Sequence, residues 1–168
     1  MTFLKNVIPY LFIIGIVIVV RVYIFIPVTV NGSSMEVTLE DGDILLLNKI
    51  KYQFNDIKRF DIVVIDYVDG RPLIKRIVGL PGEYVEYFND DLYVDDILIE
   101  ETFIREETVN FKLTDLDYDE IPEDMYFVMG DNRDNSTDSR SIGLIEKNDI
   151  LGYAGLIIYP FRRFGNAN

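Results

Sequence analysis

Two adjacent serines near the N-terminus are the first candidates for chemistry. Ser33 and Ser34 are followed at once by Met35, and the next serine comes only at position 136. The remaining serines lie together in one polar segment: Ser136, Ser139 and Ser141. A serine hydroxyl is a weak nucleophile that needs a base to take its proton. Serines most often serve turns and caps, so the pair becomes a candidate nucleophile only if the chain also offers a base.

The residue types that are missing restrict what this base can be. The chain has no histidine and no cysteine, which excludes a Ser-His-Asp triad, a thiol nucleophile, disulfides and cysteine-ligated metals. Most zinc and iron sites also need histidine, and no phosphate-binding loop or dinucleotide fingerprint occurs. Proton transfer near neutral pH must then fall to Lys, Asp, Glu or Tyr with a shifted pKa, and we expect no cofactor and no metal.

Lys75 is the obvious candidate for the base. It lies inside the apolar run of residues 73–78, where strand alternation places it on one face with Leu73 and Ile77. A lysine in this setting usually sits at a strand edge with its amine in water. To act as a base, its amine must be buried and neutral, which requires a pKa about three units below the ordinary value of about 10.4. The spacing alone leaves both interpretations open.

Residues 130–140 concentrate Asp, Asn, Arg and Ser. They do not fit a calcium-binding loop, because counting from Asp131 the sixth residue is Ser136 instead of Gly and the twelfth is Ile142 instead of Glu. An ordinary polar loop is one interpretation. A rigid hydrogen-bonded turn that holds other groups in place is the other.

The residues ahead of the serine pair are almost all apolar. Residues 7–26 would form a helix of about 30 Å, which matches the hydrocarbon thickness of a bilayer, and Pro27 is expected to end it. A cleaved secretory signal would need small residues at its cleavage site, whereas the only alanines are Ala154 and Ala167. We therefore expect a retained membrane anchor.

Length and charge describe the rest of the chain. The 168 residues allow the N-terminal segment and one further domain. The formal net charge is −13, and because the first thirty residues contain Lys5, Arg21 and no acid, the remainder carries 14 basic and 29 acidic groups, a net of −15. Such an acidic domain repels phosphate backbones, so we expect no nucleic-acid partner.

The pattern beyond residue 30 is typical of strands. β-Branched and aromatic runs separated by turn residues predict strands at residues 43–50, 61–67, 73–80, 84–88, 92–94 and 125–129. Asp69-Gly70 between two of these runs predicts a hairpin. No long segment keeps a helical apolar period, so the domain should be mainly antiparallel β. We interpret residues 105–124, which are acidic and weakly patterned, as a surface excursion.

Four blocks in order carry a family resemblance. They are GSSMEVTL at residues 32–39, RFDIVV at 59–64, IKRIVGLPGE at 74–83 and GDNRDNSTDSRSIG at 130–143. Together they resemble bacterial type I signal peptidases of peptidase family S26, the membrane-anchored serine proteases that remove secretory signal peptides. The resemblance implies a cytoplasmic N-terminus at residues 1–6, a transmembrane helix at residues 7–27 and an extracytoplasmic catalytic domain of the signal-peptidase type at residues 28–168.

The resemblance also implies roles for the candidate residues. Ser34, followed by Met35, matches the nucleophile, and Lys75 matches the general base. The hydroxyl partner of the lysine matches Ser136. The backbone N–H of Ser34 would hold the oxyanion, because Gly32 offers no side-chain donor.

Two further matches and one competitor complete the expected site. Asp138 and Arg140 match an ion pair that braces it. Ser33 competes with Ser34 for the role of nucleophile, but neighbouring side chains of an extended segment point to opposite faces, so only one of the two can meet Lys75. The pairing of Ser34 with Met35 favours Ser34.

Three positions depart from the family pattern. Val37 stands where proline is usual, Phe60 replaces a usual glycine and Glu83 replaces a usual aspartate. None of these changes removes a catalytic group, so we expect them to affect local geometry and not the chemistry.

The implied function is cleavage of N-terminal signal peptides from secretory preproteins with Ala-x-Ala-like cleavage sites, in contact with a lipid bilayer. One alternative is a Ser-Lys protease of the self-cleaving repressor type, which the anchor and the missing DNA-binding segment disfavour. Another is a catalytically silent, membrane-anchored relative that serves as a binding module. Retention of both Ser34 and Lys75 argues against that alternative.

Overall fold

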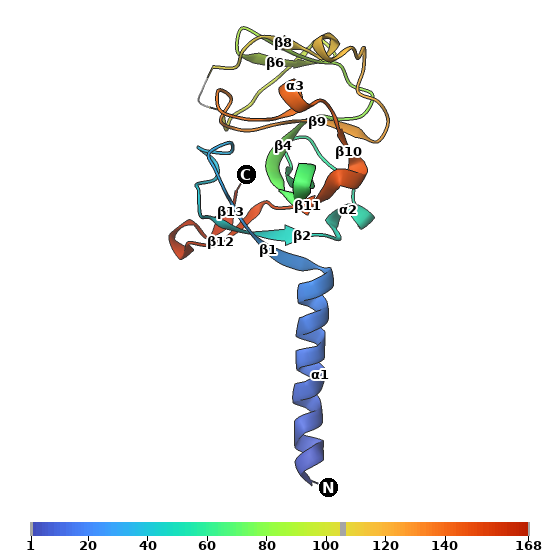
Figure 1. Cartoon of the computed structure of the whole chain (residues 1–168), viewed down its shortest axis with the longest axis vertical. Helices are drawn as coiled ribbons and strands as arrows, with labels where there is room; N and C mark the ends of the chain where they lie inside the picture. Colours follow the sequence, from blue (N-terminus) through green and yellow to red (C-terminus); the bar gives the residue numbers. More distant parts are fainter. Residues whose placement is uncertain (1, 105–106, 168) are drawn as a thin grey trace.

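The chain forms a β domain with one projecting helix (Figure 1). The computed structural model describes residues 2–104 and 107–167, and for residues 2–6, 19–23 and 69 it describes the backbone only. Thirteen strands within these residues form two sheets, one of nine strands and one of four. Every strand pair is antiparallel. The prediction of a mainly antiparallel β domain is therefore confirmed.

The larger sheet contains the strand that carries Lys75. Its strand order is β10-β9-β4-β3-β11-β2-β12-β13, and β1 also pairs with β2. The strands are β1 (Phe25–Thr29), β2 (Ile44–Asn48), β3 (Ile62–Ile65), β4 (Leu73–Gly79), β9 (Met125–Met129), β10 (Ile145–Glu146), β11 (Ile150–Tyr153), β12 (Leu156–Tyr159) and β13 (Gly165–Asn166). Both β3 and β4 lie inside the sheet, and six of the seven residues of β4 are buried. Burial on both faces explains why these strands read as continuous apolar runs instead of alternating ones.

The smaller sheet lies at the end of the domain away from α1 (Figure 1). Its strand order is β7-β6-β5-β8. The strands are β5 (Val85–Phe88), β6 (Asp91–Val94), β7 (Ile97–Ile99) and β8 (Phe111–Lys112). A shared cluster of buried side chains, including Val78 of β4, Tyr87 of β5 and Phe127 of β9, packs this sheet against the larger one.

Short helical turns connect the strands. They are α2 (Lys51–Phe54), α3 (Ser139–Ile142) and the 3₁₀ turns η1 (Val68–Gly70), η2 (Leu113–Leu116), η3 (Lys147–Asp149) and η4 (Phe161–Arg163). The turn η1 connects the paired strands β3 and β4, so the predicted hairpin is confirmed.

The N-terminal helix differs from the prediction. Helix α1 (Thr2–Tyr23) begins earlier and ends earlier than residues 7–27, and Pro27 lies within β1, opposite Leu46 of β2. Pairing with β2 draws residues 25–29 into the sheet, so the end of the apolar run belongs to the β domain. Among the residues that the structure describes, no helix is both long enough and apolar enough to cross a membrane.

Residues 107–124 are not a surface excursion, so this prediction is wrong. Phe111, Leu113 and Ile121 are buried in the cluster that joins the two sheets, and Thr108 is buried as well. The acidic residues between them face solvent, and their number hides the pattern of buried apolar positions in the sequence. Residues 105 and 106 of this interpretation lie outside the described residues.

Candidate active site

Ser34 and Lys75 meet at the edge of a cleft. The Lys75 Nζ donates a hydrogen bond to Ser34 Oγ at 2.7 Å. Lys75 comes from β4, opposite Val63 of β3, and Ser34 from the turn that follows β1. Although lysines on strands usually extend into water, Lys75 is only 1% exposed.

Burial changes the acidity of the Lys75 amine. It lowers the pKa from 10.5 to about 8, because the charged ammonium loses its hydration. The carboxylates of Asp138 and Asp131 oppose this shift by favouring the ammonium, and the Arg140 guanidinium adds to it. At pH 7 a lysine with this pKa has about 300-fold more neutral amine than an ordinary one.

The two serines of the pair point to different partners. Ser34 Oγ accepts the hydrogen bond from Lys75, whereas Ser33 Oγ accepts one from Asn135 Nδ2 at 2.8 Å. This arrangement agrees with the expectation that only one of them can meet Lys75. Met35, the next residue, is buried in a core cluster with side chains of the larger sheet and thereby fixes the turn to the domain.

The polar segment after β9 packs closely against the turn that holds Ser34. The N–H of Asn132 donates to the Ser34 carbonyl at 3.1 Å. At Gly130 an added Cβ would collide with both the Ser34 carbonyl and the Ser136 side chain. The approach of these two segments therefore depends on the absence of a side chain at position 130.

Ser136 lies on the wall of the same cleft as Ser34 and Lys75. Its hydroxyl lies near the Asp138 carboxylate and contributes to lowering the pKa of that carboxyl. Ser136 Oγ is buried and makes no hydrogen bond of good geometry with any residue that the structure describes. The expected bond between Ser136 and Lys75 is therefore absent from this arrangement, while the two residues do share the cleft.

Asp138 and Arg140 form an ion pair at the start of α3. Arg140 Nε donates to Asp138 Oδ1 at 2.9 Å and Nη2 to Oδ2 at 2.9 Å. Asp138 also caps α3 and accepts the N–H of Gly130 at 3.2 Å. Burial alone would raise the pKa of this carboxyl, but the Arg140 guanidinium, the Ser136 hydroxyl and the Gly130 N–H together outweigh it and lower the pKa. Asp138 thus stays ionised and joins α3 to the end of β9.

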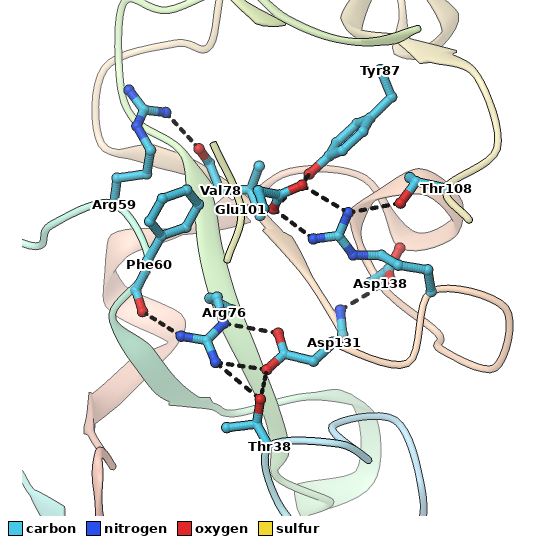
Figure 2. Close-up of polar contacts among 12 residues, drawn as sticks. Thr38, Arg59, Phe60, Arg76, Val78, Tyr87, Glu101, Thr108, Asp131 and Asp138 are labelled. Atoms are coloured by element: carbon cyan, nitrogen blue, oxygen red, sulfur yellow. Dashed lines mark hydrogen bonds and ion pairs between the residues drawn. The ribbon is translucent and has the colours of Figure 1, made fainter. Parts of the chain in front are cut away.

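A second buried ion pair involves the residue next to Lys75 in β4 (Figure 2). Arg76, the neighbour of Lys75, binds Asp131 through Nε at 2.8 Å and Nη2 at 2.6 Å. Thr38 Oγ1 donates to the same carboxylate at 2.5 Å, and the carbonyl of Phe60 accepts from Arg76 Nη1 at 3.0 Å. No motif in the sequence assigns these residues a role, although an arginine inside the apolar run of β4 indicates that it needs a buried partner.

The cleft beside the dyad has a volume of about 440 Å³. Its lining comes from the turn after β1, from β4 and from the polar segment: Asn31, Gly32, Ser33, Ser34, Leu73, Lys75, Asp134, Asn135, Ser136 and Thr137. An open cleft of this kind admits an extended chain next to the Ser34 hydroxyl.

The three departures from the family pattern have distinct structural outcomes. Phe60 has φ +69° and Val37 has φ +87°, a region that β-branched and bulky side chains rarely adopt. Proline, with φ near −65°, cannot take the backbone of Val37, so this turn differs from one built on proline. Glu83, which stands where aspartate is usual, accepts from the Leu80 N–H at 2.7 Å and from Arg59 Nη2 at 2.6 Å.

Comparison with known proteins gives a consistent result. The model of the family described as signal peptidase, peptidase S26, matches residues 3–159. Signal peptidase I of Bacillus caldolyticus is 35% identical, with 93% of this chain and 91% of that protein covered. Signal peptidase I P of Bacillus subtilis subsp. natto is 38% identical, with 90% and 86% covered.

A solved structure resembles the β domain. The crystal structure of a signal peptidase I from Enterococcus faecalis V583 has a TM-score of 0.56 and 34% identity, and the match covers 59% of this chain and 97% of that one. The predicted resemblance is thus confirmed over most of the chain, and with it the prediction that the protein is an enzyme of the hydrolase class. The chain belongs to the signal peptidase, peptidase S26, family.

Proposed function

We propose that this protein cleaves N-terminal signal peptides from secreted preproteins, with Ser34 as nucleophile and Lys75 as general base. The observation that carries the proposal is the 2.7 Å contact between Lys75 Nζ and Ser34 Oγ at a buried lysine. The names of the relatives support the substrate class.

The proposed reaction proceeds through an acyl-enzyme. The neutral Lys75 amine takes the proton of Ser34 Oγ as this oxygen attacks the carbonyl carbon of the scissile peptide bond. The resulting ammonium gives the proton to the leaving amine, and the peptide C–N bond breaks. A water molecule that passes its proton to Lys75 then attacks the ester and releases the acyl part with Ser34 restored.

The oxyanion of this reaction needs a hydrogen-bond donor. The Ser34 N–H donates to no residue that the structure describes, so it is free to face the developing charge. Gly32 adds no side-chain donor, which leaves backbone N–H groups for this task.

The supporting residues would keep the dyad in place. Ser136 shares the cleft with Lys75, and in our proposal its hydroxyl orients the lysine amine when substrate is bound. The ion pair of Asp138 and Arg140 holds the segment that carries Ser136 against the end of β9.

Residues around the cleft support an extended substrate with small side chains. The cleft lies between the turn after β1 and the first residues of β4, so a substrate strand can run between two backbone segments and present alternate side chains to its walls. In our proposal, the substrate side chains that enter the cleft at alternate positions are small, as in Ala-x-Ala-like sequences.

The test uses the purified full-length chain in detergent with a secretory preprotein as substrate. We expect cleavage at the junction between signal peptide and mature protein, identified by N-terminal sequencing of the product. A silent relative that only binds would leave the preprotein intact, and that result would refute the proposed function. A product with another N-terminus would refute the assigned cleavage site.

We also propose that helix α1 attaches the protein to the cell membrane, with its N-terminal end in the cytoplasm and the β domain outside. The large apolar side chains of α1, Ile8, Leu11, Phe12, Ile13, Ile14, Ile16, Val17 and Ile18, are 47–68% exposed. An uninterrupted exposed apolar surface of this kind is stable only when it is covered, and lipid covers all sides of a single helix.

Fractionation of cells tests this attachment. We expect the chain to stay in the membrane pellet after alkaline carbonate washing, and protease added to intact spheroplasts to digest the β domain. Release by carbonate would contradict the attachment, and protection of the β domain until detergent is added would contradict the orientation.

The depressed pKa of Lys75 predicts the pH dependence of the reaction. Because the base must be neutral, kcat/KM should rise about tenfold per pH unit up to the pKa of about 8 and level off above it. A pH series with a preprotein substrate, with folding checked by circular dichroism at each pH, measures this profile. A flat profile between pH 6 and 8 would contradict the role of Lys75 as base.

A further inference from the structure

A buried charged cluster connects the smaller sheet to the segment that lines the active site. Arg133, in the polar segment after β9, has a side chain that is 1% exposed. Its Nη2 donates to Glu101 Oε1 at 2.6 Å, and its Nη1 donates to Glu101 Oε2 at 3.1 Å and to Thr108 Oγ1 at 3.0 Å. Such a forked pair fixes both the direction and the position of the guanidinium.

Glu101 is itself held from the other side (Figure 2). The hydroxyl of Tyr87, in β5, donates to both Glu101 oxygens at 3.1 Å. Burial, reinforced by the Glu101 carboxylate, raises the pKa of Tyr87, which keeps this phenol a donor. The carboxylate therefore stands between a fixed phenol of the smaller sheet and the guanidinium of Arg133.

The contacts continue from Arg133 to the dyad. The carbonyl of Arg133 accepts a hydrogen bond from Arg140 Nη2 at 2.7 Å. Arg140 in turn pairs with Asp138, whose carboxylate accepts the N–H of Gly130. Gly130 lies in close contact with the Ser34 carbonyl. An unbroken series of short contacts thus joins Glu101 to the turn that holds the nucleophile.

The same short segment also touches the strand that carries Lys75. The ring of Phe103, two residues after Glu101, lies 3.9 Å from the guanidinium carbon of Arg76 and 5.0 Å, centroid to centroid, from the ring of Phe60. Residues 101–103 therefore contact both halves of the site, through Arg133 on the side of the polar segment and through Arg76 on the side of β4.

We propose that Glu101 is a positioning residue for catalysis: by binding Arg133 it sets the placement of residues 130–138 against Ser34 and Lys75. This inference rests on the proposed function. The proposal gives the smaller sheet a role in positioning the catalytic residues. Glu101 lies outside the four sequence blocks, so the family resemblance does not imply this role. Glu101 touches no reacting atom, so its effect is on the rate of the chemical step and not on the binding of substrate.

Replacing Glu101 with glutamine in the full-length protein tests the proposal. Glutamine keeps the size of the side chain but removes the charge that holds Arg133, and small displacements of reacting groups reduce rates strongly. We expect kcat for preprotein cleavage to fall about 10- to 100-fold with KM changed by less than about twofold. The matched control is Glu100→Gln, because Glu100 is the exposed neighbour in the same segment and should retain the wild-type kcat.

A second control separates positioning from general stability. Val94→Ala removes buried apolar volume from the smaller sheet, and the side chain of Val94 makes none of the hydrogen bonds or ion pairs that hold Glu101 and Arg133. At a temperature where this variant is folded, it should keep its kcat even if its melting temperature drops as much as that of Glu101→Gln. Equal losses of kcat in the two variants would overturn the proposal, as would wild-type kcat in Glu101→Gln.

A milder variant covers the case in which Glu101→Gln does not fold. Tyr87→Phe removes only the hydroxyl that holds Glu101 and should lower kcat several-fold with KM unchanged. Wild-type kcat in this variant would overturn the proposal. Failure of the proposed function gives a different result, because the wild-type protein itself would then not cleave the preprotein.

Discussion

Replacing Ser34 with alanine is expected to lower kcat for preprotein cleavage by about 10⁴-fold or more. The change removes the hydroxyl oxygen that Lys75 Nζ binds, and groups that act as one unit lose almost all their effect when one is removed. Binding of the preprotein should persist, because the walls of the cleft stay intact. Single-turnover cleavage with excess enzyme, followed by gel electrophoresis, measures the loss.

The neighbouring serine provides the matched control for this experiment. Ser33→Ala removes a hydroxyl of the same size one residue away, whose partner is Asn135 and not Lys75. We expect less than about a threefold change in kcat, since an exposed side-chain hydrogen bond contributes little. The assignment of the nucleophile is wrong if Ser33→Ala abolishes cleavage while Ser34→Ala does not.

Lys75→Met is expected to reduce kcat by about 10³-fold or more. Methionine fills the same buried space, so the fold should be kept, but it cannot accept the proton of Ser34. Removal of a buried amine also removes a desolvation cost, so the melting temperature should not fall. The kinetic loss with retained stability distinguishes a missing base from a damaged core.

An exposed lysine serves as the control for Lys75. Lys58→Met makes the same chemical change in a side chain that faces solvent and should leave kcat unaltered. Raising the pH is not expected to rescue Lys75→Met, because the methionine side chain has no group that can accept the Ser34 proton at any pH. Full activity of Lys75→Met at pH 8 would refute the Ser-Lys mechanism.

Much of the fold could be predicted because its signals are local. The runs that became β4 and β9 are β-branched and bounded by turn residues, and the strands begin and end close to where these runs do. The short strands β8, β10 and β13 have two residues each and no pattern of their own. They exist because the neighbouring strands offer unpaired backbone groups, which is a tertiary property.

The end of α1 is also decided by tertiary contacts and not by the local sequence. Residues 24–26 continue the apolar run of the helix, and no residue before Pro27 signals a break. The structure instead gives Phe25–Thr29 to β1, whose register places Ile26 opposite Leu47 and Val28 opposite Leu45. Apolar composition suits a helix and a buried strand equally, so only the presence of β2 decides between them.

For the site, the sequence by itself led to the proposed reaction type and to the two residues that we propose perform it. Without histidine or cysteine, the base for a serine nucleophile must be Lys, Asp, Glu or Tyr, and the resemblance of the four ordered blocks points to Ser34 and Lys75. They also indicate the ion pair of Asp138 and Arg140. These conclusions depend on which chemical groups the chain contains and in what order, and the sequence states both directly.

Only the tertiary structure decided whether that lysine is poised to act as a base. The pKa of Lys75 falls because distant parts of the chain bury it. Its amine meets Ser34, 41 positions away in the sequence, because β4 and the turn after β1 come together. The links from Asp131 to Arg76 and from Glu101 to Arg133 are likewise fixed by packing. The solvation of a side chain and the geometry of its hydrogen bonds depend on all residues that surround it in space. The order of residues along the chain does not specify those neighbours.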